Sequence, residues 1–329
     1  MKFIFKVLSH DEGSRLDIYL SSKLKNITRN IVQRLIGIGN VEINGVIVEK
    51  NSLLVNKGDE IKINTDYKED VIKSKEILYK DIPINIVYKD DNLLVVNKQT
   101  GLVVHPAKGN YDNTLLNGLE YKYNKDKNSK EKLSFYLINR IDKDTSGIVL
   151  VALNRRALWF FSRQFEERDV EKYYIAVVNG DISNLFKNKK KYCCSNYIGR
   201  NPKNRKKFSV VDKDKGRLAT TDFYCLDKKE DDKFGKTSIV LARLRTGRTH
   251  QIRVHLSQLG YPIVGDNLYG SEDYDRMMLH SYLVRINMFD RRSDRTFRAP
   301  IPKAYEEFFD LNNIIKKIDN IISKNDESI

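Results

Sequence analysis

The sequence predicts an α+β protein with two folding units, a small one at the N-terminus and a larger one after it. Short runs of β-branched and aromatic residues cluster along the chain without the regular strand–helix–strand alternation of a parallel α/β sheet. The first 70 residues combine two helical patterns with a hairpin signal, which predicts a module of their own. A chain of 329 residues has room for this module and one large domain.

The N-terminal module should hold two helices and a small sheet. A first helix should begin near Ser14, and a second helix near Thr28, which is a suitable N-cap. Two short strands, at 41–43 and 46–48, meet at Asn44-Gly45. Because the two-residue turns of hairpins need a positive φ at their central residues, Asn-Gly is a strong hairpin signal.

Composition and periodicity divide the chain into four segments. These are the module at residues 1–70, a linker at 71–82, the main domain at 83–311, and a C-terminal helix and tail at 312–329. The linker belongs to a lysine- and aspartate-rich stretch without helical or strand periodicity, and it ends just before Pro83. Isoleucines recur at helical spacing in the last segment, which predicts a short helix with one apolar face.

The main domain should be built mostly from strands. They are expected at residues 84–88, 93–97, 148–152, 172–180 and 238–245. A helix is expected at residues 155–168, where Leu158, Trp159, Phe161 and Phe165 form an apolar face. We expect the three aromatic side chains in the core, and the arginines of the helix against phosphate or water.

The charge of the chain favours a polyanionic partner. Lysine and arginine number 59 against 44 for aspartate and glutamate, a formal net charge of +15. No apolar run approaches the length of a membrane-spanning helix, and the N-terminus is too short for a signal-peptide core, so we expect a cytoplasmic protein without membrane contact. Residues 187–207 hold the densest group of cations, interleaved with tyrosines. That composition suits RNA, and a solvated loop is the alternative.

Patterns typical of metals and cofactors are missing from the sequence. Cys193, Cys194 and Cys225 lack zinc-type spacing, as do His250 and His255. The chain also has neither a dinucleotide-type glycine loop nor a P-loop. We therefore expect an activity that needs neither metal nor cofactor.

A turn crowded with charge leads directly into the strand at 148–152. Its charged residues are Arg140, Asp142, Lys143 and Asp144. Since charges packed beside a buried strand are costly unless they are paired or used, the turn is a candidate site. A solvated turn, a calcium loop and a structural Arg140–Asp142 pair are the alternatives. The calcium pattern lacks its last ligand, because Leu153 stands where glutamate is needed.

Three stretches of the chain resemble the signatures of the RluA family of RNA pseudouridine synthases. Residues 140–147 read Arg-Ile-Asp-Lys-Asp-Thr-Ser-Gly, residues 172–180 match Lys-x-Tyr-x-Ala-x-Val-x-Gly, and residues 246–253 read Thr-Gly-Arg-Thr-His-Gln-Ile-Arg. The likeness extends over almost the whole chain. It implies an isomerase that converts uridine in RNA to pseudouridine.

The resemblance implies three catalytic residues. Asp142 would be the nucleophile, and Tyr174 would stack on the extruded uracil beside it. Arg253 would pair with Asp142 and keep its carboxylate ionised, and a bidentate pair would also fix its orientation. The sequence leaves open whether the carboxylate attacks the ribose or assists a glycal-like intermediate.

Further residues are implied to bind the substrate. Arg140 would fill the space left by the extruded base, and Arg248 and Gln251 would shape the site. Asn139 stands where the family commonly has histidine, so it keeps a hydrogen-bonding side chain there but cannot titrate.

The resemblance also implies the fold and the partner. The catalytic domain would be a mixed, mostly antiparallel sheet flanked by helices. The N-terminal module resembles an S4-like RNA-binding domain, with Arg29 and Arg34 facing RNA. Large-subunit ribosomal RNA is the expected substrate, with transfer RNA second, and the enzyme is expected to be a monomer. The competing hypothesis is a non-catalytic RNA-binding factor for ribosome assembly. Loss of Asp142, Tyr174 or Arg253 would favour that factor, and all three are present.

Overall fold

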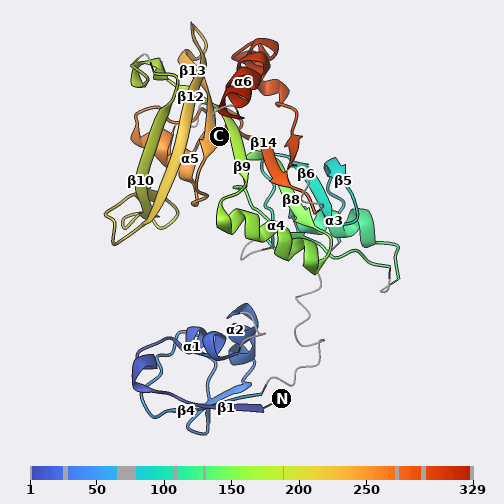
Figure 1. Cartoon of the computed structure of the whole chain (residues 1–329), viewed down its shortest axis with the longest axis vertical. Coiled ribbons are helices and arrows are strands. Elements are labelled where there is room, and N and C mark those ends of the chain that lie inside the picture. Colours follow the sequence, from blue (N-terminus) through green and yellow to red (C-terminus); the bar gives the residue numbers. More distant parts are fainter. Residues whose placement is uncertain are drawn as a thin grey trace. The chain divides into compact units, whose positions relative to one another are not determined.

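The computed structural model describes residues 2–24, 29–64, 79–106, 110–128, 131–187, 189–270, 274–289 and 294–326. The chain divides into two compact units, Met1–Glu76 and Ile77–Ile329 (Figure 1). Residues 71–78 of the predicted linker lie outside the described residues, as does the predicted N-cap Thr28. Ile82, by contrast, is buried in the core of the second unit. The boundaries of the four predicted segments stay a prediction.

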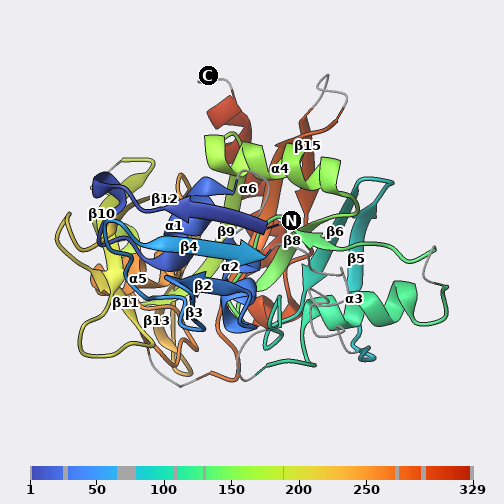
Figure 2. The ribbon, with the colours of Figure 1, turned by 90° about the horizontal axis from the view of Figure 1, so that it is seen from below.

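The first unit is a small antiparallel sheet with two helices on one face (Figures 1 and 2). Its elements are β1 (Lys2–Lys6), η1 (Ser9–Asp11), α1 (Leu16–Lys23), α2 (Arg29–Gly37), β2 (Val41–Ile43), β3 (Val46–Ile47) and β4 (Glu60–Asn64). The strands lie in the order β1-β4-β2-β3. The predicted hairpin is confirmed, because β2 pairs with β3 across Asn44 and Gly45, whose φ angles are 53° and 82°.

The second unit is built on one long mixed sheet (Figure 1). Its strands are β5 (Asn85–Lys89), β6 (Leu93–Lys98), β7 (Tyr136–Leu137), β8 (Ser146–Ala152), β9 (Glu171–Asn179), β10 (Tyr192–Arg200), β11 (Phe208–Val210), β12 (Arg217–Asp231), β13 (Gly235–Leu244), β14 (Leu279–Asn287) and β15 (Asp294–Arg298). They follow the order β11-β10-β12-β13-β9-β14-β8-β6-β5, while β7 joins β8 and β15 joins β14. Among the strand pairs described, β8 and β14 are parallel and the others antiparallel. The predicted α+β fold with a mostly antiparallel sheet is therefore confirmed.

Helices cover this sheet and close its core. They are α3 (Leu115–Asn124), α4 (Arg155–Glu167), α5 (Gln251–Gln258) and α6 (Leu311–Asp326), with the short 3-10 helices η2 (Ile182–Leu185) and η3 (Lys303–Glu307). The C-terminal helix α6 packs its isoleucines Ile314, Ile318 and Ile322 into the core formed with β9 and β13. This apolar face is the one expected from the sequence, and it makes α6 part of the second unit.

Gly147 allows β8 and β14 to run side by side. Its φ is 108°, a backbone conformation that L-amino acids rarely adopt. A Cβ atom at this position would lie 2.2 Å from the carbonyl oxygen of Ser281. Since backbone atoms fill that space, glycine is required here. The charged turn before Gly147 is thereby held against the centre of the sheet.

Helix α4 corrects one prediction about the core. Phe161 is fully buried, but Trp159 is 61% exposed. Two residues along a helix correspond to a rotation of about 200°, which puts the two side chains on nearly opposite faces, so both cannot face the sheet. The buried face of α4 is formed by Ala157, Phe161 and Gln164. Leu158 and Phe165 pack only partly against it.

Candidate active site

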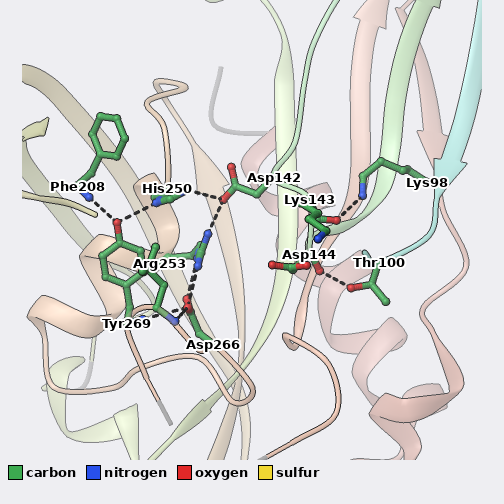
Figure 3. Close-up of polar contacts among 11 residues, drawn as sticks. Lys98, Thr100, Asp142, Lys143, Asp144, Phe208, His250, Arg253, Asp266 and Tyr269 are labelled. Atoms are coloured by element: carbon green, nitrogen blue, oxygen red, sulfur yellow. Dashed lines mark hydrogen bonds and ion pairs between the residues drawn. The ribbon is translucent and has the colours of Figure 1, made fainter. Parts of the chain in front are cut away.

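Asp142 lies on the loop that connects β7 to β8, and three neighbours hold this loop. Lys98, at the end of β6, donates a hydrogen bond from Nζ to the carbonyl oxygen of Lys143 at 2.9 Å. Thr100 donates from Oγ1 to the carbonyl oxygen of Asp144 at 2.6 Å (Figure 3). Asn139 accepts a hydrogen bond on Oδ1 from the backbone N–H of Leu150 at 2.7 Å. These contacts fix the backbone on both sides of Asp142.

Lys98 is a fully buried lysine beneath this loop. Burial lowers the pKa of its ammonium group to about 7, although the negative charges of Asp144 and Asp142 oppose that shift. The ammonium also donates a hydrogen bond to the carbonyl oxygen of Gln99 at 2.8 Å. A titratable group therefore supports the backbone next to Asp142.

Arg253 reaches Asp142 from α5. Its Nη1 donates a hydrogen bond to Oδ2 of Asp142 at 3.0 Å. The bidentate pair lies elsewhere, because Nε and Nη2 of Arg253 donate to the two carboxylate oxygens of the buried Asp266 at 2.7 and 2.8 Å. Burial lowers the pKa of Arg253, but the hydrogen bonds and charge of Asp266 outweigh burial and raise it above its usual value. The predicted Arg253–Asp142 contact exists, but it is a single hydrogen bond.

His250 also faces Asp142, and the sequence did not predict its role. It precedes α5 in the left-handed conformation, with φ 57° and ψ 20°. Its Nε2 lies 3.8 Å from Oδ2 of Asp142, and its Nδ1 lies 2.9 Å from the hydroxyl of Tyr269 (Figure 3). The histidine belongs to the 246–253 stretch, but only its spacing to His255 was informative in the sequence. Asp266 ends a further stretch, residues 261–266, that resembles the family, but the sequence predicted no role for Asp266 or Tyr269.

A pocket of about 250 Å³ opens on one side of Asp142; we call it the first pocket. It gathers the catalytic and substrate-binding residues predicted in the second unit. These are Asn139, Arg140, Asp142, Tyr174, Arg248, Gln251 and Arg253. Leu244, Ile252 and Leu279 add apolar surface, and Asp142 is the only carboxylate among the lining residues described. The first pocket therefore combines apolar surface with polar and charged side chains that can orient a ligand.

Tyr174 forms a wall of the first pocket from strand β9. Its side chain is 8% exposed. Burial, together with the nearby charge of Asp142, raises the pKa of its phenol to about 12. The ring is therefore neutral at pH 7 and presents an aromatic surface next to the carboxylate.

Gln251 stabilises the rim of the first pocket. Its Oε1 accepts hydrogen bonds from Thr246 Oγ1 and from the backbone N–H of Arg248, at 2.8 and 2.9 Å. Its Nε2 donates to the carbonyl oxygen of Thr220 and to Thr221 Oγ1, at 3.0 and 2.9 Å. The side chain is buried and bonded on both ends, so it shapes the loop that carries Arg248.

Two cations extend the rim of the first pocket toward solvent. Arg140 is exposed on the Asp142 loop. Arg248 donates from Nε to the carbonyl oxygen of Leu218 at 3.0 Å. Burial lowers the pKa of Arg248, and the charges of Arg217 and Arg168 lower it further. The mouth of the first pocket is therefore strongly positive.

A second pocket, of about 490 Å³, shares Asp142, His250 and Arg253 with the first. It is also lined by Asp144 and Arg276. Asp142 thus lines both cavities, and 27% of its side chain is exposed.

Arg29 and Arg34 belong to α2 of the first unit. Arg29 donates two hydrogen bonds to the buried Asp17, at 2.9 and 3.1 Å. Burial raises the pKa of Asp17, but hydrogen bonds from Arg15, Gln33 and Arg29 outweigh burial and hold it well below the usual range. Arg29 therefore joins α2 to α1, while Arg34 is exposed on α2.

The predicted basic region, residues 187–207, includes strand β10 and the turn between β10 and β11. Exposed or half-exposed cations follow one another there: Arg200, Lys203, Arg205, Lys206 and Lys207. We call residues 200–207 the basic loop. Within the described residues, no group of three or more histidine, cysteine or acidic side chains is arranged to hold a metal. None of the described helices is long and apolar enough to cross a membrane.

This fold and pocket define a pseudouridine synthase. The human protein "RNA Pseudouridylate Synthase Domain Containing 1" superimposes with a TM-score of 0.57 and 31% sequence identity, over 69% of this chain and 87% of that one. A model of the RNA pseudouridylate synthase family matches residues 92–258, and the S4 domain model matches residues 14–61.

Two full-length relatives support the same assignment. A ribosomal large subunit pseudouridine synthase D from Borreliella burgdorferi is 36% identical over 95% of both chains. An uncharacterized RNA pseudouridine synthase from Chlorobaculum parvum is 34% identical over 94% of this chain and 95% of its own. The chain belongs to the RNA pseudouridylate synthase family: it is an isomerase that acts on uridine in RNA and carries an S4 domain at its N-terminus.

Proposed function

We propose that this enzyme isomerises uridines in large-subunit ribosomal RNA and that Asp142 is its nucleophile. One observation carries the catalytic part. Asp142 is the only carboxylate lining the first pocket within the described residues, and it faces Tyr174 and Arg253 there. A reaction that breaks and reforms a bond at the ribose needs one such group close to the sugar.

The proposed reaction begins when a carboxylate oxygen of Asp142 attacks C1′ of the target nucleotide. The N1–C1′ bond breaks, and uracil leaves as an anion held against Tyr174. After the base turns, C5 bonds to C1′ and displaces the aspartate. C5 then loses its hydrogen and N1 gains a proton, so no electrons enter or leave the system. This balance agrees with a site that needs neither redox group nor donor.

The target base must leave its RNA context before it reaches Asp142, which costs a few kcal/mol. Contacts between the aromatic ring of Tyr174 and the uracil would offset part of this cost. Arg140 is exposed at the mouth of the first pocket, so it is our candidate for the space that the base vacates. Arg248 would hold a phosphate nearby, and Gln251 and Asn139 would act by holding the loops in place.

The S4 domain and the basic loop supply the remaining RNA contacts in this proposal. Exposed arginines and lysines bind phosphates without reading sequence, so they give affinity and not the choice of uridine. We assign this role to Arg34 and the basic loop, and a smaller one to Arg29, which is occupied by Asp17. A ribosomal substrate would place the enzyme in the cytoplasm. We also propose that the enzyme acts as a monomer.

The ribosomal part of the proposal rests on the Borreliella burgdorferi relative, whose printed name states that substrate. A pseudouridine map of cells that lack the gene, complemented with the parent enzyme or with Asp142→Asn, tests both parts. We expect sites in large-subunit ribosomal RNA to vanish and to return only with the parent enzyme. If sites in transfer RNA vanish instead, transfer RNA is the substrate. If Asp142→Asn restores the sites fully, Asp142 is not the nucleophile.

A further inference from the structure

Four residues form a continuous chain of contacts that ends at Asp142. The backbone N–H of Phe208 donates a hydrogen bond to the hydroxyl of Tyr269 at 2.7 Å. That hydroxyl lies 2.9 Å from Nδ1 of His250, whose Nε2 lies 3.8 Å from Oδ2 of Asp142. Figure 3 shows the four residues in this order along the dashed lines. These contacts link strand β11 to the proposed nucleophile through Tyr269 and His250, for which the sequence predicted no role.

These contacts suit the tautomer of His250 that carries its proton on Nε2. Burial lowers the pKa of His250, so its ring is neutral at pH 7 and has one N–H. Burial raises the pKa of Tyr269, which therefore keeps its hydroxyl proton. That hydroxyl accepts from Phe208, and we assign its own proton to the contact with Nδ1 of His250. The N–H of His250 is then on Nε2 and points toward Asp142.

Two side chains consequently face one oxygen of Asp142, and only Arg253 lies within hydrogen-bond distance of it. Arg253 bonds Oδ2 at 3.0 Å, and Nε2 of His250 approaches the same atom. Within the described residues, Oδ1 accepts no hydrogen bond, and Figure 3 shows it pointing away from Arg253 and His250. One carboxylate oxygen is held and the other is left for chemistry.

The other end of the chain lies at the basic loop. Lys207 places its ammonium 5.8 Å from the ring centre of Tyr269, and Arg253 covers the same ring at 5.0 Å. Phe208, which follows Lys207 directly, packs its ring edge-on against His250 at 5.6 Å. Tyr269 is therefore in contact with both the loop proposed to bind RNA and the arginine that holds Asp142.

We propose that Tyr269 and His250 are positioning residues that present Oδ1 of Asp142 to the ribose, and that RNA bound by the basic loop stabilises this arrangement. The inference rests on the proposed function of Asp142 as nucleophile. It adds that binding and chemistry are coupled: contacts made by Lys207 should affect the rate of the reaction as well as the affinity for RNA.

The test compares single-turnover rates on an RNA fragment that contains the uridine found by the pseudouridine map. Labelling C5 of uridine with tritium makes the reaction visible, because C5 loses its hydrogen. We expect Tyr269→Phe, which deletes only the hydroxyl, to lower the rate at saturating RNA about tenfold while the Kd for RNA changes less than twofold. His250→Asn keeps a residue that tolerates the left-handed conformation and should show the same loss.

Double variants test the chain as a unit. Tyr269→Phe combined with His250→Asn should be no slower than either single variant, since each breaks the same chain. Lys207→Gln should lower the saturated rate of the parent enzyme but not that of Tyr269→Phe. The matched control is Tyr261→Phe, which deletes a half-buried hydroxyl that has no hydrogen bond within the described residues.

Each outcome separates this inference from the proposed function. A parent-like saturated rate for Tyr269→Phe and His250→Asn would overturn the inference, even if Asp142→Asn is inactive. Additive losses in the double variants would also overturn it, because the residues would then act independently. If Asp142→Asn stays active, Asp142 is not the nucleophile. This result comes from a different variant than those that test Tyr269 and His250.

Discussion

Arg253 and Asp266 form a buried bidentate ion pair, with Nε–Oδ2 and Nη2–Oδ1 distances of 2.7 and 2.8 Å. Asp266 is held in turn by the backbone N–H groups of Leu268 and Tyr269, at 3.0 and 3.1 Å. Burial opposes ionisation of Asp266, but Arg253 outweighs burial and holds the pKa of that carboxyl below its usual value. The guanidinium is thus fixed by Asp266, and its Nη1 is left to donate to Asp142.

Because Asp266 holds Arg253, we predict that Asp266→Asn lowers catalytic activity through Arg253 and not through a contact with the substrate. Asparagine keeps one acceptor but loses the charge, so Arg253 would be free to turn away from Asp142. We expect kcat/KM to fall about 100-fold, as small displacements of a catalytic group do, and stability to fall about 3 kcal/mol. Tritium release and urea unfolding measure the two effects.

The control for this prediction is Asp232→Asn, which changes an exposed aspartate in the turn between β12 and β13. It should leave both quantities within error of the parent enzyme. Equal activity of Asp266→Asn and the parent would show that Asp142 does not depend on the orientation of Arg253.

The basic loop predicts salt-dependent affinity. Replacing Lys203, Arg205 and Lys206 by glutamine removes three exposed cations without disturbing a buried contact. Each lost phosphate contact should reduce the slope of log K against log salt by about 0.7 to 0.9. Titration of RNA at several salt concentrations measures this slope. An unchanged slope would mean that this loop is solvated and does not bind the RNA backbone.

Lys98 predicts a pH dependence of stability. Its pKa is about 7 in the folded protein, against about 10.4 in an unfolded chain. Between these values the unfolded chain binds more protons than the folded one, so raising the pH favours folding. The cost of the buried charge is complete below pH 7 and disappears as the pH approaches 10.

Comparison with Lys98→Met isolates this contribution. From pH 7 to pH 10, the stability of the parent relative to Lys98→Met should rise by up to about 1.4 kcal/mol per pH unit. Urea unfolding at a series of pH values measures the difference. A difference that is constant over this range would show that Lys98 keeps its ordinary pKa in the folded protein.

Local patterns in the sequence were sufficient for much of the fold and for the members of the site. Asn44-Gly45 determines its own turn, and the hairpin follows from it. The residues implied by resemblance in the second unit, among them Asp142, Tyr174 and Arg253, line one pocket. Motif spacing captures such residues because they come from short, contiguous stretches.

Contacts between distant segments were beyond the sequence. Asp266 takes the bidentate contact expected at Asp142, because it lies on the turn that follows α5, and no spacing rule reveals that approach. The contact between His250 and Tyr269 likewise depends on how the segment after α5 folds back toward the start of that helix. Arg29, expected to face RNA, pairs with a buried aspartate for the same reason: its partner is set by how two helices pack.

Helix α4 offers the sharpest test of the difference between composition and packing. Trp159 was expected in the core, but it is 61% exposed, and the guanidinium of Arg163 lies over its ring at 5.6 Å. Trp159→Ala should therefore cost less than about 1 kcal/mol of stability. Phe161→Ala, two residues away and fully buried, should cost about 3–5 kcal/mol because it leaves a cavity between α4 and the sheet.

Circular dichroism during urea unfolding is the appropriate measurement, because Trp159 is the only tryptophan of the chain and its fluorescence disappears in the variant. The midpoint of Trp159→Ala should stay close to that of the parent, and the midpoint of Phe161→Ala should fall clearly. A large loss with Trp159→Ala would mean that this side chain is covered by another part of the protein in solution, and that the apolar face expected from the sequence was the correct one.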